Sequence, residues 1–228
     1  MAILSIIYPV KSLKQDQLVL KAIERYSGLD VEQIIVTSDR SEKNETNLIY
    51  YIETTSRASR MNRGLKVAKS ELVLFHHPRS LIDKEGITSL IENGLNIDWG
   101  AFTHRFDKSS FMLNFTSFYS NYIRGDLRNI FYLDHCLFAH KSILLSIGGF
   151  PEIDIFEDTE ICKKLNSISK GKRLKYDSIT SAIRFEHAGF WKQAYLNFLM
   201  KKDYYLRKSH ITMNQKYEEN MDLNSDYE

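Results

Sequence analysis

The sequence predicts an α/β protein with a mostly parallel sheet and helices on both of its faces. Three short, β-rich apolar runs support this prediction, at residues 2–8, 33–36 and 72–75. Continuous apolar runs of this length are typical of strands that are buried on both faces, as parallel strands are. Segments with helical spacing lie between them, and polar residues follow each strand. This alternation predicts a ligand crevice at the carboxyl ends of the strands.

In the first part of the chain, turn and cap residues separate the expected elements. Pro9 ends the first apolar run, and Gly28 follows the first helical pattern, where glycine is a common stop signal. The expected elements are, in order, a strand over 2–8, a helix over 13–26, strands over 33–36 and 48–52, a helix over 57–68 and a strand over 72–75.

The second part of the chain continues the alternation less regularly. An aromatic stretch over 108–129 has no clean period, so an irregular helix and a mobile flap over the crevice are both open. The other expected elements are a helix over 83–95, strands over 99–106 and 136–138, a helix that opens at 157, short strands over 174–176 and 181–185, and a closing helix over 190–207. We expect one domain over 1–210 and a polar, disordered tail over 211–228.

The composition is that of a globular protein. The 228 residues are 43% hydrophobic and 26% charged, and a formal net charge of +2 predicts no nucleic-acid partner. Cys136 and Cys162 lie among apolar neighbours and are expected to be core residues in a reducing compartment. With no signal peptide and no apolar run of membrane-spanning length, we expect a cytoplasmic protein.

Two adjacent carboxylates, Glu157 and Asp158, stand where the helix at 157 is expected to begin. Backbone N–H groups at a helix start favour an ionised carboxylate and leave one oxygen able to accept a proton. Asp158 is therefore a candidate general base. Acidic residues also cap helices commonly, and that interpretation stays open on local grounds.

Taken together, the motifs resemble the family 2 glycosyltransferases of the GT-A fold. The similarity is greatest to a small single-domain branch, the radical-SAM/selenodomain-associated transferases. The residues that carry the resemblance are the strand 72–75 with Arg57, Ala58, Met61, Asn62, Gly64, His77, Trp99, Gly100, Phe102, Arg105, Phe106, Asp134, Phe138, Gly148, Gly149, Phe150, Pro151, Glu152, Glu157, Asp158, Glu160, Ser181, Ala182, Arg184, Phe185 and Gly189. Their order and spacing carry the signal, because each motif alone is common.

The resemblance implies transfer of a sugar from a nucleotide diphosphate sugar to an acceptor hydroxyl, with inversion at the anomeric carbon. Asp158 would be the general base and Glu157 its neighbour in the catalytic pair, while Asp134 and Arg184 would lie on the acceptor side. The residues implied on the donor side are Pro9, Thr37, Asp39, Arg57, Asn62, His77 and Arg79. The acceptor is unknown, with a lipid-linked compound or a glycan as candidates.

Three donor-side positions depart from the family pattern. Arg79 stands where the family has an Asp that binds a divalent cation, Thr37 replaces an Asp that contacts the nucleoside, and Lys11-Ser12 replaces Asn-Glu. An arginine cannot coordinate Mg²⁺ or Mn²⁺, but it pairs with phosphate. Three hypotheses follow: a metal-independent transferase in which Arg79 holds the diphosphate, a non-catalytic nucleotide-sugar-binding or interaction protein, or a metal held through one of the two histidines 76 and 77.

The closing helix and the residues after it, from Phe190 to Lys208, combine aromatic residues with lysines. Core packing is the simpler interpretation of this pattern. Peripheral contact with the inner face of an anionic membrane is the alternative, and it would suit a lipid-linked acceptor.

Overall fold

The computed structural model describes residues 2–12, 17–39, 49–52 and 56–218, and its centre is one sheet of eight strands. The strands are β1 (Leu4–Pro9), β2 (Val31–Thr37), β3 (Ile49–Tyr51), β4 (Leu72–Phe75), β5 (Ser80–Ile82), β6 (Trp99–Phe106), β7 (Leu137–His140) and β8 (Lys172–Thr180). The α-helices are α1 (Gln17–Arg25), α2 (Arg57–Val67), α3 (Lys84–Asn93), α4 (Phe111–Phe118), α5 (Lys141–Ser146), α6 (Glu157–Asn166), α7 (Ile183–Ala188), α8 (Phe190–Tyr205) and α9 (His210–Glu218). Two 3₁₀ turns, η3 (Gly94–Asn96) and η5 (Leu133–His135), and a π-helix, η4 (Tyr119–Leu127), complete the described elements.

The strand order is β3-β2-β1-β4-β7-β6-β8-β5. β1 pairs in parallel with β2 and β4, β2 with β3, and β6 with β8. β7 is antiparallel to β4 and β6, and β5 is antiparallel to β8. β7 and β5 thus run against the other strands, and the predicted mostly parallel sheet is confirmed.

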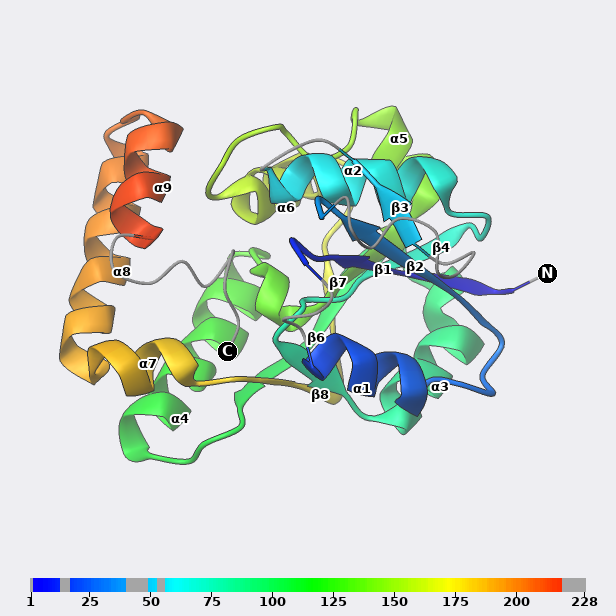
Figure 1. The fold of residues 1–228 in the computed structure, drawn as a ribbon, viewed down its shortest axis with the longest axis horizontal. Helices are drawn as coiled ribbons and strands as arrows, with labels where there is room; N and C mark the ends of the chain where they lie inside the picture. Colours follow the sequence, from blue (N-terminus) through cyan, green and yellow to red (C-terminus); the bar gives the residue numbers. More distant parts are fainter. Residues whose placement is uncertain (1, 13–16, 40–48, 53–55, 219–228) are drawn as a thin grey trace.

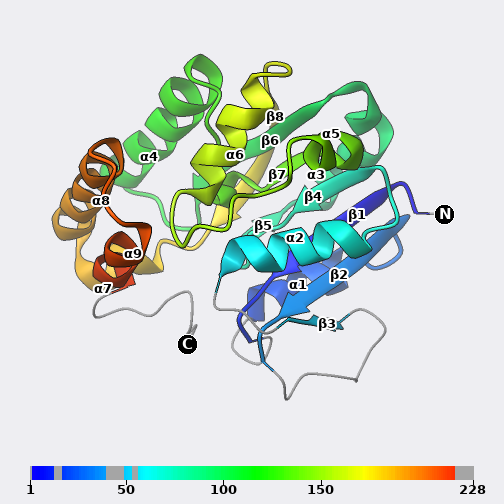
Figure 2. The ribbon, with the colours of Figure 1, turned by 90° about the horizontal axis from the view of Figure 1, so that it is seen from above.

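The sheet is covered on both faces, as Figures 1 and 2 show: α2, α5 and α6 lie on one side and α1 and α3 on the other. Each face has its own apolar core. Met61, Leu65 and Ile161 from α2 and α6 belong to one core, and Val19 and Leu90 from α1 and α3 belong to the other. This burial is the main favourable term in folding and explains why the strands are apolar on both sides.

Helix α2 packs very closely on the central strand β1. A Cβ atom added at Gly64 would lie 2.4 Å from Ile7 Cγ2, so only glycine permits this approach. Asn62 joins the same helix to the loop before α6: its amide donates to the Phe150 carbonyl at 2.8 Å, and its Oδ1 accepts from the Phe150 N–H at 2.9 Å. These contacts set α2 and α6 relative to each other.

Two expectations for the second part of the chain were wrong or incomplete. Residues 181–185 were expected to form a strand, but β8 ends at Thr180 and the chain turns into helix α7. The Ala182 N–H donates to Asp107 Oδ1 at 2.9 Å at this turn.

β8 extends back to Lys172 because pairing with β6 and β5 supplies its hydrogen bonds, which an alternating polar sequence does not reveal. The open question at 108–129 is answered by a helix, α4 continued by η4.

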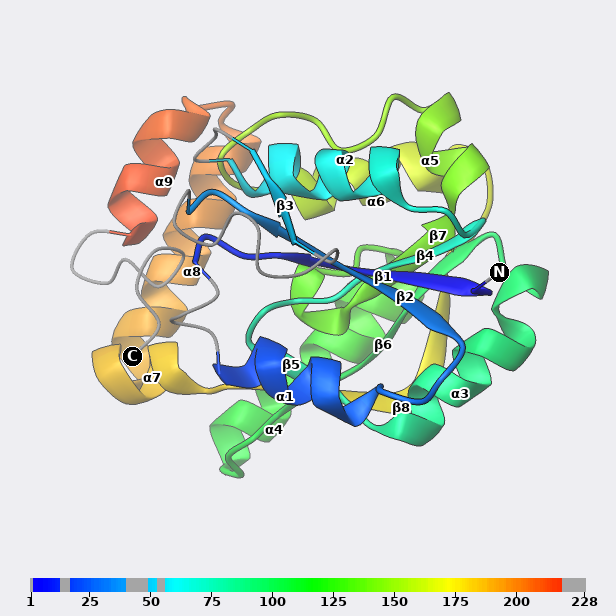
Figure 3. The same ribbon diagram turned by 45° about the vertical axis from the view of Figure 1, so that its right-hand side comes forward.

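The helices α7, α8 and α9 stand together at one end of the molecule, away from the N-terminus (Figure 3). A small cluster of Phe156, Met200 and Met213 connects α8 and α9 to the loop before α6. The expected disorder of 211–218 is therefore corrected: this segment is helical because Met213 is buried in the cluster. Residues 219–228 of the predicted tail lie outside the described residues. Over the described chain, no helix is both long and apolar enough to span a bilayer.

Candidate active site

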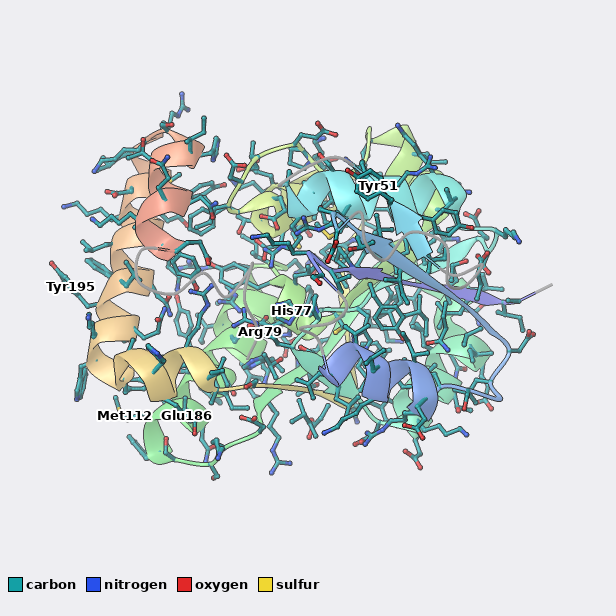
Figure 4. The ribbon with its side chains drawn as sticks, in the orientation of Figure 1. Tyr51, His77, Arg79, Met112, Glu186 and Tyr195 are labelled. Carbon is teal, nitrogen blue, oxygen red and sulfur yellow. The ribbon has the colours of Figure 1, made fainter. Side chains whose placement is uncertain are left out.

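A cavity of about 250 Å³ opens at the carboxyl ends of β4, β6 and β8, where the sequence predicts a crevice. Its walls come from the segments after these strands, from the start of α6, from η4 and from α7 to α9. Figure 4 shows His77 and Arg79 beside each other near the middle of the molecule. The sequence-predicted residues that line the cavity are Arg57, His77, Arg79, Asp134, Asp158 and Arg184.

Asp158 lies in the first turn of α6 and is 7% exposed. Its Oδ2 accepts from the Leu133 N–H at 3.1 Å, and its Oδ1 accepts from the Thr159 N–H at 2.7 Å. Burial and the adjacent Glu157 charge raise the pKa of Asp158 to about 6, although Arg57 and the Leu133 N–H act in the opposite direction. A carboxylate with this pKa is ionised at neutral pH and accepts a proton more readily than an ordinary aspartate.

The residue before this helix turn has a strained backbone. Phe156 caps α6 with φ +67° and ψ 17°, in the left-handed region that non-glycine residues rarely adopt. Its ring packs against Tyr204 of α8, with 4.6 Å between the ring centroids, and it lines the cavity. Strain of this kind often marks functional sites, and here it sets the direction in which Glu157 and Asp158 leave the loop.

Glu157 is not among the residues that line the cavity. It is fully buried, and Arg57 holds its Oε1 with both Nε and Nη2 at 2.5 Å. Within the described part of the chain its Oε2 has no hydrogen-bond partner. Arg57 begins α2 and does line the cavity, so one guanidinium joins the two helices and presents its remaining surface to the cavity.

The turn after β4 orients His77 and Arg79. The Arg79 N–H donates to His77 Nδ1 at 3.2 Å, and the Ser80 N–H donates to the His77 carbonyl at 3.0 Å. Burial, with the charges of Arg79 and Arg57, holds the pKa of His77 well below its usual value. His77 is thus neutral, and because Nδ1 accepts, its proton is on Nε2. His76 faces away, with Nε2 3.1 Å from the Tyr26 hydroxyl.

Asp134 also lines the cavity, next to His104 and His135. Its Oδ2 is 3.6 Å from His104 Nε2. Burial alone would raise its pKa, but His104, His135 and Arg124 around it hold the pKa below the usual value. The Asp134 carboxylate is therefore ionised throughout the physiological range and is a weaker base than Asp158.

The remaining acceptor-side candidate, Arg184, lies in α7 and contacts two residues of α9. Its Nη2 donates to Glu218 Oε1 at 2.8 Å, and its guanidinium lies 4.4 Å from the centre of the Tyr217 ring. Both partners come from α9, the segment that was expected to be disordered. The C-terminal helix is therefore part of the site.

Four predicted donor-side residues lie outside this cavity: Pro9, Thr37, Asp39 and Asn62. Thr37 Oγ1 donates to the Lys11 carbonyl and accepts from the Asp39 N–H, each at 3.0 Å, so it joins the ends of β1 and β2. Asn62 makes its two hydrogen bonds with the backbone of Phe150. Residues 13–16, 40–48 and 53–55 fall outside the described residues.

Sequence reasoning missed two cations of this cavity, Arg124 and Lys201. Arg124 lies in η4, within the aromatic stretch that has no clean period, and Lys201 lies in the closing helix. Because π-helices are rare, the sequence did not predict one here. They occur frequently at functional sites, so the π-helix became a usable signal only once the structure was known.

The residues at the family's metal position do not fit a divalent cation. Arg79 offers only donors, and His77 Nδ1 already accepts from the backbone. Among the residues that the structure describes, no three His, Cys, Asp or Glu side chains form a group that could hold a metal ion.

No protein-family model and no curated protein matches the sequence. Among solved structures, the chain is similar to TarS 1-349 of S. aureus, with a TM-score of 0.58 and 16% identity over 96% of this chain and 70% of that one. The same piece in complex with UDP-GlcNAc gives a TM-score of 0.59, with 16% identity over 96% of this chain and 71% of TarS 1-349. Against a longer TarS structure the TM-score is 0.56 and the identity 16%, and this chain spans 42% of it. At this identity the likeness shows the fold alone, which is that of the GT-A-type glycosyltransferases.

Proposed function

We propose that this protein is an inverting glycosyltransferase that moves a sugar from a nucleotide diphosphate sugar to an acceptor hydroxyl. The observation that carries the proposal is that Asp158, a carboxylate with a pKa of about 6, and Arg79, a cation of the type that pairs with phosphate, line one cavity at the carboxyl ends of a GT-A-type sheet. The resemblance of the motifs to family 2, and to its radical-SAM-associated branch, supports the same assignment.

In the proposed reaction, Asp158 removes the proton from the acceptor hydroxyl. The acceptor oxygen attacks the anomeric carbon from the face opposite the diphosphate and forms the new glycosidic bond. The bond from that carbon to the diphosphate oxygen breaks, and its electron pair leaves with the nucleoside diphosphate. Arg79 and the His77 Nε2–H stabilise the charge that develops on the leaving group, which makes the reaction metal-independent.

Arg79 is expected to dominate binding of the diphosphate. Arg79→Met should weaken UDP binding by about 10- to 100-fold, since hydrogen bonds to charged groups contribute roughly 1.5–3 kcal/mol each. Isothermal titration with UDP in EDTA measures this, and Arg63→Met, an exposed arginine of α2, is the matched control. Equal UDP affinity in the wild type and in Arg79→Met would contradict the assignment.

The alternative is a nucleotide-sugar-binding protein without turnover, which the departures at Thr37 and Arg79 favour. A thermal shift against a panel of nucleotide sugars, each with and without Mn²⁺, separates the two candidates when it is followed by transfer and donor-hydrolysis assays. Stabilisation without any turnover identifies the binding protein. No stabilisation by any nucleotide sugar would contradict both.

We further propose that residues 190–208 contact an anionic membrane surface. Trp191, Tyr195 and Phe198 of α8 are 76%, 63% and 60% exposed, so the core-packing interpretation does not hold for them. Figure 4 shows Tyr195 at the outer edge of this helix. Exposed aromatic residues beside lysines suit the boundary of a bilayer.

Replacing Trp191, Tyr195 and Phe198 together by Ser should reduce co-sedimentation with phosphatidylglycerol-containing vesicles several-fold, because it removes the apolar contact area. Phe111→Ser, which alters another exposed aromatic residue in α4, is the control. Equal co-sedimentation of the triple variant and the wild type would contradict membrane contact through this helix.

A further inference from the structure

Two cations stand on the wall of the cavity that is formed by η4 and α8. Arg124 lies over the Tyr132 ring, with 3.4 Å from its guanidinium carbon to the ring centroid, and Lys201 Nζ lies 5.5 Å from the centroid of Tyr119. Both side chains line the cavity. Arg128, at the end of η4, is exposed and close enough to act on Lys201 electrostatically. We call Arg124 and Lys201 the cationic wall.

The cationic wall has no acidic partner among the described residues. Arg124 donates to Ser120 Oγ, its Nε is buried without an acceptor, and Lys201 makes no hydrogen bond or ion pair within the described chain. Burial, Arg124 and Arg128 together lower the pKa of Lys201 to about 8. The Asp134 carboxylate interacts electrostatically with Arg124, but it stands beside His104 and forms no ion pair with either cation within the described chain. Like charges gathered without an ion-paired counter-charge are costly unless an anion binds there.

A chain of hydrogen bonds holds Arg124 in place. His135 Nδ1 is 2.9 Å from the Phe102 carbonyl, which can only accept, so this nitrogen carries the proton. His135 Nε2 then accepts from the Ser120 hydroxyl at 2.7 Å, which leaves the Ser120 oxygen to accept from Arg124. The guanidinium is thus positioned before any ligand arrives, as in a prebuilt binding site.

The cationic wall lies apart from the proposed diphosphate site but next to the base. Arg79 and Arg57 come from the turn after β4 and from α2, whereas Arg124 and Lys201 come from η4 and α8. Tyr132, on which Arg124 rests, immediately precedes Leu133, whose N–H binds Asp158. An anion held by the cationic wall would therefore lie close to the segment that binds Asp158.

We propose that Arg124 and Lys201 bind a phosphate group of the acceptor, so that the acceptor is a phosphorylated compound. Arginine pairs with two phosphate oxygens at once and lysine supplies a point charge, a combination that suits the charged oxygens of a phosphate better than a single carboxylate. This inference rests on the proposed function, since it assigns this side of the cavity to the acceptor.

The test is calorimetric titration of the full chain in EDTA, saturated with UDP so that the donor site is filled. Four probes are compared: glucose 6-phosphate, the phosphodiester glycerophosphoglycerol, glucuronate and glucose. We expect glucose 6-phosphate or the phosphodiester to bind at least tenfold more tightly than glucuronate and glucose, and the tighter of the two tells whether the acceptor phosphate is a monoester or a diester.

Lys201→Met and Arg124→Lys should each weaken phosphate binding about tenfold or more and leave UDP affinity unchanged. Lys192→Met, which changes an exposed lysine of the same helix, should alter neither. Lys201→Met keeps the test valid if Arg124 variants fold poorly.

Several outcomes would overturn the inference: equal affinity for glucose 6-phosphate, glucuronate and glucose, unchanged phosphate binding in Lys201→Met, or displacement of UDP by glucose 6-phosphate. Each of these leaves the proposed function intact as long as UDP-sugars bind and turn over. Absence of any UDP binding, by contrast, would contradict the proposed function itself.

Discussion

Asp158→Asn should lower sugar transfer by about 100-fold or more while nucleotide-sugar affinity stays within about twofold of the wild type. General-base catalysis contributes roughly 10²- to 10⁴-fold, and an amide cannot accept the proton of the acceptor hydroxyl. The side chain keeps its size, and Asn Oδ1 can still accept from a backbone N–H, as Asp158 does from Leu133. Transfer rates and UDP-sugar titrations measure the two quantities separately.

The pH profile gives a second readout of the same assignment. The pKa of Asp158 is raised to about 6, so the base is protonated below that pH and ionised above it. The transfer rate of the wild type should therefore fall as the pH is lowered through about 6 and level off above it. Glu152→Gln, an exposed acid in the loop before α6, is the control. Transfer by Asp158→Asn at the wild-type rate would remove Asp158 from the mechanism.

Arg57→Met should lower the free energy of unfolding by about 3 kcal/mol, because removing one partner of a buried ion pair leaves the other charge uncompensated. The carboxylate left behind is that of Glu157, which is fully buried and accepts from Arg57 at 2.5 Å. Thermal or denaturant unfolding at neutral pH measures the loss. Arg57 also lowers the pKa of Asp158, so in this variant the acid limb of the rate profile should move to higher pH.

The double variant Arg57→Met with Glu157→Gln separates charge from packing. If the lost stability comes from the uncompensated carboxylate, neutralising Glu157 should restore most of it. Arg63→Met, on the exposed face of the same helix, should change stability by less than about 0.5 kcal/mol. An Arg57→Met protein as stable as the wild type would show that the pair does not hold α2 to α6.

Local sequence patterns predicted much of the fold because the buried strands carry their own signal. The runs that became β1 and β4 are apolar on both faces, α2 has helical spacing, and the acidic pair lies in the first turn of α6. Only residues 174–176 of β8 were predicted as a strand, and α9 was not predicted. β8 is polar and pairs with β6 and β5, and α9 packs through Met213, so both depend on partners far away in the chain.

For the site, the sequence by itself determined which chemistry is available. It has an acidic pair at a helix start, and an arginine after the fourth strand where the family that the motifs resemble has an acid. Only the tertiary structure decided how these groups are used. It buried Glu157 against Arg57, placed Asp158 in the cavity, and brought Arg124 and Lys201 to the same cavity from segments 77 residues apart. The physical reason is that the sequence sets the chemical type of each side chain. Its burial, and the electrostatic field that acts on it, depend on neighbours that only folding brings together.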